Sequence, residues 1–101
     1  MAKKTLIYWR DIPSQVVVQK GRIREKVKLS ERFQNAIDSA AMRAGKGSSD
    51  AYLAEWRREA STCDASDGLR ALAEHEASRL EAEFSDDHLL RLIHNHGSAS
   101  D

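Results

Sequence analysis

The sequence predicts an α+β fold in which a small antiparallel sheet is covered by two to three helices. Residues 5–29 are rich in β-branched and aromatic side chains, and part of this stretch alternates with the period of a strand. Later segments instead carry apolar residues at helical spacing. The chain has 101 residues, of which 41% are hydrophobic and 32% charged, so it suits one domain with a modest core. We expect that domain over residues 1–97 and a disordered tail over residues 98–101.

The N-terminal part predicts a hairpin and a third extended stretch. Residues 6–9 have strand composition, and turn-forming residues around Pro13 separate them from extended residues 15–19. A link of only four residues favours antiparallel pairing, so the sheet begins with an N-terminal hairpin. Basic residues then alternate from residue 20 to residue 28, and Gly21 marks a bend. One bent strand and two paired strands both remain open.

The C-terminal part predicts helices. Ser30 is a good N-cap for a helix that ends at Gly45, and further helices are expected over residues 69–84 and 85–97. Residues 51–60 predict a short helical turn followed by a strand. The order of strands before helices predicts helices over one face of the sheet. A ferredoxin-like plait is the alternative if residues 53–60 join the sheet, and the strand order is left undetermined.

Charge and cysteine content bear on where the chain works. The lone Cys63 cannot form an internal disulfide, and the apolar run at residues 5–9 is too short for a secretion signal or a membrane span. We therefore expect a cytoplasmic protein without a membrane partner. The net charge is zero, yet residues 1–50 carry 11 Lys/Arg and 5 Asp/Glu, while residues 51–101 carry 5 and 11. This separation predicts either a basic binding face or, as the favoured reading, a basic sheet neutralised by acidic helices.

No set of residues predicts catalysis or metal binding. Cys63 is followed by Asp64 and Asp67, and neighbouring acids disfavour a reactive thiolate. His94 and His96 lie two residues apart, whereas paired helical metal ligands lie four apart. We therefore predict no catalytic residue, no metal site, no cofactor and no enzymatic activity.

Two tryptophans that each precede arginine are the first candidate site. Tryptophan and arginine are enriched at interface hot spots because they bury a large area and keep a polar group. The alternative is that both tryptophans belong to the core. The candidate interface consists of Trp9, Arg10, Asp11, Ile12, Pro13, Trp56 and Arg57.

A ladder of alternating basic residues is the second candidate site. Sheets that bind single-stranded nucleic acid combine a basic groove with stacking aromatic rings. No aromatic residue interrupts this ladder, and the pI is about 6.9, so an RNA-binding module is the alternative function. The ladder comprises Lys20, Arg22, Arg24, Lys26 and Lys28.

Several stretches carry a resemblance to a known family. They are residues 7–16, which read IYWRDIPSQV, residues 29–33, 36–38, 40–45 and 52–58, and residues 79–83 in the later acidic helix. The chain resembles the short bacterial virulence factor domain family, whose domain also occurs in larger proteins called conserved virulence factor C. The resemblance implies no reaction and transfers no catalytic residue. It implies that stand-alone members accompany methylenetetrahydrofolate reductase and cobalamin-dependent methionine synthase components, so we expect a non-catalytic accessory protein that docks on such an enzyme.

Overall fold

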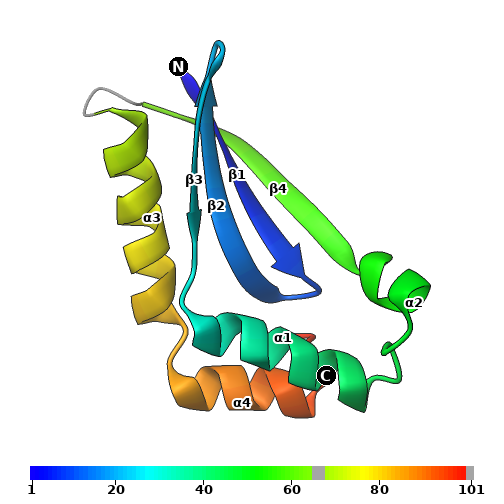
Figure 1. Ribbon diagram of the computed structural model, residues 1–101. Coiled ribbons are helices and arrows are strands. Elements are labelled where there is room, and N and C mark those ends of the chain that lie inside the picture. Colours follow the sequence, from blue (N-terminus) through cyan, green and yellow to red (C-terminus); the bar gives the residue numbers. More distant parts are fainter. Residues whose placement is uncertain (65–67, 100–101) are drawn as a thin grey trace.

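The computed structural model describes residues 1–64 and 68–99 and has the α+β fold that the sequence predicts (Figure 1). A four-stranded sheet has the strand order β3-β2-β1-β4, and every neighbouring pair is antiparallel. Four helices pack against it. The elements are β1 (Ala2–Trp9), β2 (Ile12–Lys20), β3 (Ile23–Lys28), α1 (Glu31–Arg43), α2 (Ser49–Leu53), β4 (Trp56–Cys63), α3 (Leu69–Glu83) and α4 (Asp86–His94).

The sheet is not a ferredoxin-like plait. That fold needs a helix between its first and second strands, whereas β1, β2 and β3 follow one another through tight turns. Strand β4 then returns to the free edge of β1, so residues 56–60 of the stretch 53–60 contribute a strand without producing a plait. The strand continues through residues 61–63, because they pair with the start of β1.

The first hairpin turn is shorter than predicted. Arg10 and Asp11 alone form the turn, and Pro13 lies inside β2. The register shifts where β1 passes from Ile7 to Tyr8, which leaves Ser14 as an extra residue in β2. Proline lacks a backbone donor and is tolerated at such a bulge, so a turn-forming residue can stand within a strand.

Of the two alternatives that the sequence leaves open after residue 15, the structure has two paired strands joined by a second turn. Gly21 has a positive φ of 61° and forms a two-residue turn with Arg22. Glycine adopts this conformation without the steric penalty that other residues meet. Strand β3 therefore folds back on β2 as the edge strand of the sheet.

The helices form two separate layers against the sheet. Helix α3 lies along one face, whereas α1 and α4 lie together across the lower end of the sheet (Figure 1). Val16 and Val18 are fully buried on the α3 side. Charged contacts join α3 to the same face, since Lys4 lies 3.3 Å from Glu76. The prediction that helices cover one face of the sheet is thus met by α3, whereas α1 and α4 pack across the lower end of the sheet.

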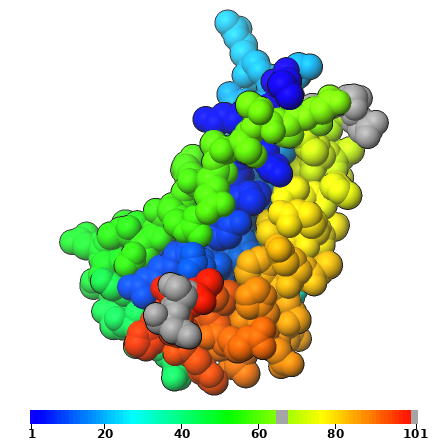
Figure 2. Space-filling view, turned by 180° about the vertical axis from the view of Figure 1, so that it is seen from behind, coloured from blue at the N-terminus to red at the C-terminus, as the bar shows by residue number. Residues whose placement is uncertain are grey.

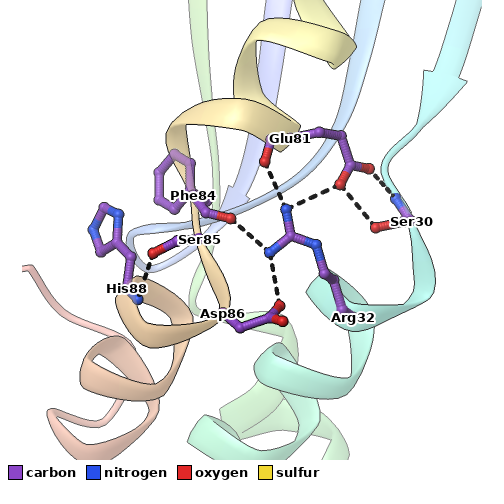
Figure 3. Close-up of polar contacts among 7 residues, drawn as sticks. All are labelled: Ser30, Arg32, Glu81, Phe84, Ser85, Asp86 and His88. Atoms are coloured by element: carbon purple, nitrogen blue, oxygen red, sulfur yellow. Dashed lines mark hydrogen bonds and ion pairs between the residues drawn. The ribbon is translucent and has the colours of Figure 1, made fainter.

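Arg32 connects three helices at that lower end (Figure 3). Its guanidinium donates to the carbonyl oxygens of Phe84 at 2.6 Å and Glu81 at 2.7 Å, and it lies 3.2 Å from the carboxylate of Asp86. Ser30 caps α1 at the predicted position, but its hydroxyl donates to the Glu81 carboxylate and makes no bond to the helix. The start of α1 is therefore held by a side chain from α3.

Residues 98–99 are bonded to the rest of the fold. The Ala99 amide donates to the carboxylate of Asp11 at 2.6 Å, and Asn95 donates to the Ser98 carbonyl at 2.8 Å. In Figure 2 the C-terminal segment, shown in red, lies beside the first hairpin, shown in blue. The expectation of a disordered tail is thus wrong for residues 98–99, and residues 100–101 lie outside the described part of the chain.

Trp9 lies where the sheet, α2 and the C-terminal segment meet. Its side chain is 0% exposed, and its indole nitrogen donates to the Tyr52 carbonyl at 2.9 Å. Gly97 packs against the ring so closely that a Cβ there would lie 2.9 Å from a ring carbon. The Asp11 amide donates to the Gly97 carbonyl at 2.9 Å, which fixes the glycine in this position.

We expect Gly97→Ala to lower the free energy of unfolding by about 2–4 kcal/mol, because the methyl group clashes with Trp9 and the residue has a positive φ. Gly45→Ala is the matched control, since Gly45 also has a positive φ but faces open space, and should cost only about 1–2 kcal/mol. Urea denaturation measures both. Equal losses in the two variants would contradict close packing at Gly97.

Glu76 is the charged residue buried deepest in the described structure, and it lies between two cations. Arg79 donates to it from Nε at 2.9 Å, and Lys4 approaches from β1. Hydrogen bonding from Arg79 is the main cause that lowers the pKa of the Glu76 carboxyl, against the opposing effect of burial. A carboxyl with a lowered folded-state pKa stabilises the fold above its unfolded-state pKa, and this contribution disappears as the pH falls through the folded-state value.

We expect Glu76→Gln to lower the free energy of unfolding at neutral pH by about 1–2 kcal/mol, since its cationic partners are partly exposed. The difference from the wild-type protein should shrink as the pH falls through the lowered folded-state pKa of Glu76, because the protonated carboxylic acid is uncharged like the amide. Denaturant unfolding over a series of pH values from neutral into the acid range measures this. Glu74→Gln on the exposed side of α3 should change little, and a pH-independent loss in Glu76→Gln would refute the electrostatic explanation.

Candidate interaction surface

One face of the sheet carries basic side chains in regular rows. Side chains alternate between the two faces of a strand, so the register between strands places three rows of four residues on the same face. The rows are Arg24–Gln19–Lys3–Thr62, Lys26–Val17–Thr5–Ala60 and Lys28–Gln15–Ile7–Arg58. We call this surface the basic face, and it contains five cations and no acidic residue.

The basic face is open. Among the described elements, no helix covers the upper part of this side of the sheet, because α3 packs on the opposite side (Figure 1). All five cations are exposed. None of their side chains has an ion pair or hydrogen bond within residues 1–64 and 68–99, whereas Lys4 on the other face pairs with Glu76. The favoured reading of a sheet neutralised by its own helices therefore holds for the α3 side and fails for the basic face.

Two apolar residues lie in the middle of the basic face. Ile7 is 8% exposed and Val17 is 5% exposed, yet neither belongs to the main core cluster. Their neighbours in the rows are long basic and amide side chains, whose alkyl stems can cover apolar surface while their polar ends stay in water. Ile7 and Val17 are thus largely covered, and cationic side chains border them on the surface of the face.

Three of the predicted interface residues are core residues. Trp9 and Ile12 are 0% exposed, and Pro13 is among the fully buried side chains. The assignment of these residues to a surface is wrong, because α2 and the C-terminal segment cover the hairpin end. The tryptophan–arginine pattern did not distinguish a core tryptophan from a surface one.

The charged residues of the predicted interface form hydrogen bonds and ion pairs with one another and with neighbouring residues of the fold. Arg57 donates from Nε to the Arg10 carbonyl at 2.6 Å and lies 2.9 Å from the Asp11 carboxylate. It also pairs with Glu59 and lies over the Tyr8 ring, with 4.4 Å between the guanidinium carbon and the ring centroid. Burial would lower the pKa of Arg57, but hydrogen bonds to Glu59 and Asp11 outweigh burial and raise it. Arg57 therefore ties the first turn to β4.

Arg10 has a similar role beside it. Its guanidinium donates to the His96 carbonyl at 2.9 Å and to the Glu55 carboxylate at 3.0 Å. The cationic group also lies 5.4 Å from the centroid of Trp9. Arg10 is thus half-buried and joins the first turn to the segments before β4 and after α4.

Only three of the five residues in the predicted basic ladder lie on the same face of the sheet. Arg24, Lys26 and Lys28 belong to the basic face. Lys20 pairs with Ile23 at the opposite parity, and Arg22 lies in the turn, so these two do not extend the rows. Sequence reasoning missed Lys3 and Arg58, which reach the same face from β1 and β4. Only the register between strands distant in the sequence brings them there.

Trp56 borders a small hollow in the third row. The hollow has a volume of about 250 Å³ and is lined by Ile7, Gln15, Trp56, Arg57 and Arg58. The Oε1 atom of Gln15 is buried and accepts no hydrogen bond in the described structure. Trp56 is half-buried and meets the Tyr52 ring edge-on, with the ring centroids 5.8 Å apart.

The other side chains that could be reactive or bind a metal form no candidate site within residues 1–64 and 68–99. The Cys63 thiol lies 3.6 Å from the Ala2 carbonyl, to which it donates. Within residues 1–64 and 68–99, no three His, Cys, Asp or Glu side chains are gathered as metal ligands would be. In the same residues, each helix is too short or too polar to cross a membrane. The strongest candidate site is therefore the basic face.

Comparison with known proteins agrees with the resemblance described above. A family model described as "Virulence factor" matches residues 7–93, which span all four strands at least in part and all but the last residue of α4. Neither curated proteins nor solved structures provided a significant match. The matched span includes the basic face except Lys3 and Thr5. The chain therefore belongs to the virulence factor domain family.

Proposed function

We propose that this chain is a non-catalytic accessory protein that docks on a larger protein through the basic face. The observation that carries this proposal is an exposed sheet face with five cations and no acidic residue. Like charges about 6.6 Å apart along a strand repel each other by about 0.6 kcal/mol before salt screening. The five cations thus lower the stability of the free chain, and nothing in the described fold packs against them. A surface of this kind is suited to an acidic partner.

Charged residues outside the basic face form ion pairs within the fold, and this supports a non-catalytic role. Arg57 and Asp11 bind each other across the first turn, and Glu76 is held between Lys4 and Arg79. These groups are oriented by partners within the fold, and their bonds join separate elements. They are better suited to structural roles than to binding a substrate.

The proposed partner is a cytoplasmic enzyme of folate and methyl-group metabolism. The resemblance to the family supports this choice, since it implies that stand-alone members accompany methylenetetrahydrofolate reductase and cobalamin-dependent methionine synthase components. The basic face adds a requirement, because the docking site on either enzyme should then be acidic.

We expect a tagged wild-type chain, purified from its native host, to recover one of these enzymes in near-stoichiometric amount by mass spectrometry. The triple variant Lys26→Glu, Lys28→Glu, Arg58→Glu should recover at least about tenfold less, because it reverses the charge of the surface. It should remain folded, since all three side chains are exposed and without ion pairs among the described residues.

The matched control is the double variant Arg43→Glu, Arg91→Glu, which reverses exposed charges on α1 and α4. It should recover the enzyme as the wild-type chain does. Equal recovery by the triple variant would show that docking does not use the basic face. If the wild-type chain recovers no stoichiometric enzyme, the accessory role itself is refuted.

RNA binding is a second candidate function, because single-stranded nucleic acid binds to open sheets with exposed cations. The basic face meets the electrostatic requirement. Its rows contain no aromatic residue, however, and of the two tryptophans that border them among the described residues, Trp9 is fully buried and Trp56 is half-buried. Successive bases would have no stacking platform, so the observations favour a protein partner.

We expect a fluorescein-labelled oligouridine to show no saturable anisotropy change with the wild-type chain at physiological salt. Weak binding at low salt should disappear as salt rises, in the manner of sequence-independent electrostatic contacts. Saturable binding at physiological salt, lost in Arg24→Ala and Lys26→Ala, would favour the RNA-binding module over the accessory role.

A further inference from the structure

We infer that the hollow beside Trp56 is the anchor site of the basic face and receives an acidic peptide segment of a partner protein. An apolar side chain of that segment packs on Ile7 and Trp56, a main-chain N–H donates to Gln15 Oε1, and a carboxylate pairs with Arg58. This inference rests on the proposed function, since it names the feature of the partner that the docking surface recognises.

The hollow lies within the basic face. Gln15, Ile7 and Arg58 are neighbours across three strands in the third row, and Trp56 precedes Arg58 by two residues on β4, so it has the same parity. The volume of about 250 Å³ is large enough for one or two side chains of a peptide and too small for a folded element. Of the other cations, Lys28 lies in the same row, and Lys3, Arg24 and Lys26 lie in the other two rows.

Gln15 supplies an unused acceptor at this position. A buried acceptor without a hydrogen bond costs about 1–3 kcal/mol relative to a satisfied one. The atom is enclosed in the unbound chain, so the Gln15 side chain must turn toward the hollow before a donor can reach it. A peptide main chain provides N–H donors at regular intervals and can then satisfy Oε1 without a special side chain. The polar atom therefore favours a ligand that brings a donor.

Trp56 gives the hollow a rigid apolar wall. Its ring meets Tyr52 edge-on, and Tyr52 stacks on Trp9 with 5.9 Å between ring centroids. Trp9 is fully buried, so the exposed part of Trp56 is supported by the core through a series of rings. Interface hot spots are commonly aromatic residues held in this way, because little conformational entropy is lost on binding.

Arg58 is the cation available to a carboxylate at the hollow. Arg57 beside it is neutralised by Asp11 and Glu59, whereas Arg58 is exposed and has no ion pair within the described residues. Lys28 lies in the same row and Lys26 in the next, so further acidic residues of the segment meet further cations. The charge pattern thus favours a segment with several acids and at least one apolar side chain.

We expect a short fluorescein-labelled peptide with alternating glutamate and leucine to bind the wild-type chain, as measured by fluorescence anisotropy. Arg58→Gln and Gln15→Leu should each weaken binding roughly tenfold, which corresponds to the loss of one hydrogen bond or ion pair. Arg43→Gln and Asn35→Leu, at exposed positions of α1 away from the basic face, are the matched controls and should not change affinity. A peptide with glutamine in place of glutamate should bind far more weakly.

Urea denaturation separates binding from stability. Gln15→Leu removes an unsatisfied buried acceptor and should leave the free energy of unfolding unchanged or higher, whereas a structural role of Gln15 would lower it together with affinity. Unchanged affinity in both Gln15→Leu and Arg58→Gln, or no binding of the peptide by the wild-type chain, would overturn the anchor site.

The two proposals can fail separately. If the peptide does not bind but recovery of the enzyme from the host still depends on Lys26 and Lys28, the anchor site is refuted and docking on the basic face remains. If the peptide binds as expected but no enzyme is recovered, the accessory role is refuted and the anchor site remains. Concentration-dependent self-association that is lost in Arg58→Gln would instead assign the surface to a second copy of this chain.

Discussion

Trp9 is the residue on which the arrangement of the other elements depends. It ends β1, is completely buried, and donates to the carbonyl of Tyr52. The close approach of Gly97 to its ring brings the end of the chain back to the first turn. One side chain thus fixes three segments that are far apart in the sequence, and Trp56, its partner in the sheet register, is held next to them. The wall of the proposed anchor site is therefore built on the core.

The position of α3 determines which face of the sheet is left open. Helix α3 contributes Glu76 and Arg70, which pair with Lys4 of β1 and Glu25 of β3 on the same face. These pairs and the buried valines of β2 hold the helix there, so the cations with the opposite parity have no helix to neutralise them. A chain with zero net charge consequently has a strongly charged surface. Net charge and pI, which argue against a polyanionic partner, do not describe this distribution.

Much of the fold could be predicted because its signals are local. The alternation in β3, the cap at Ser30 and the helical spacing that follows each depend on residues within a few positions of one another. Pro13 was misread as part of a turn because its place in a bulge depends on pairing with β1. For a similar reason the sequence leaves open whether Trp9 belongs to an interface or to the core: its neighbour Arg10 indicates an interface, while Gly97 and Tyr52, which bury it, are distant in the sequence. Family membership was also predictable, as the matching stretches are contiguous.

The sequence by itself determined the α+β class, the positions of most elements and the placement of Arg24, Lys26 and Lys28 on one side of a strand, because side-chain alternation is a property of a single strand. The tertiary structure decided that this side stays uncovered and that Lys3 and Arg58 join it. The two hairpins pair residues that are close in the sequence, whereas the place of β4 beside β1 arises from distant contacts such as that between Thr5 and Ala60, and helix packing then selects which face is covered. Those choices depend on the summed free energy of the whole core, which no local pattern contains.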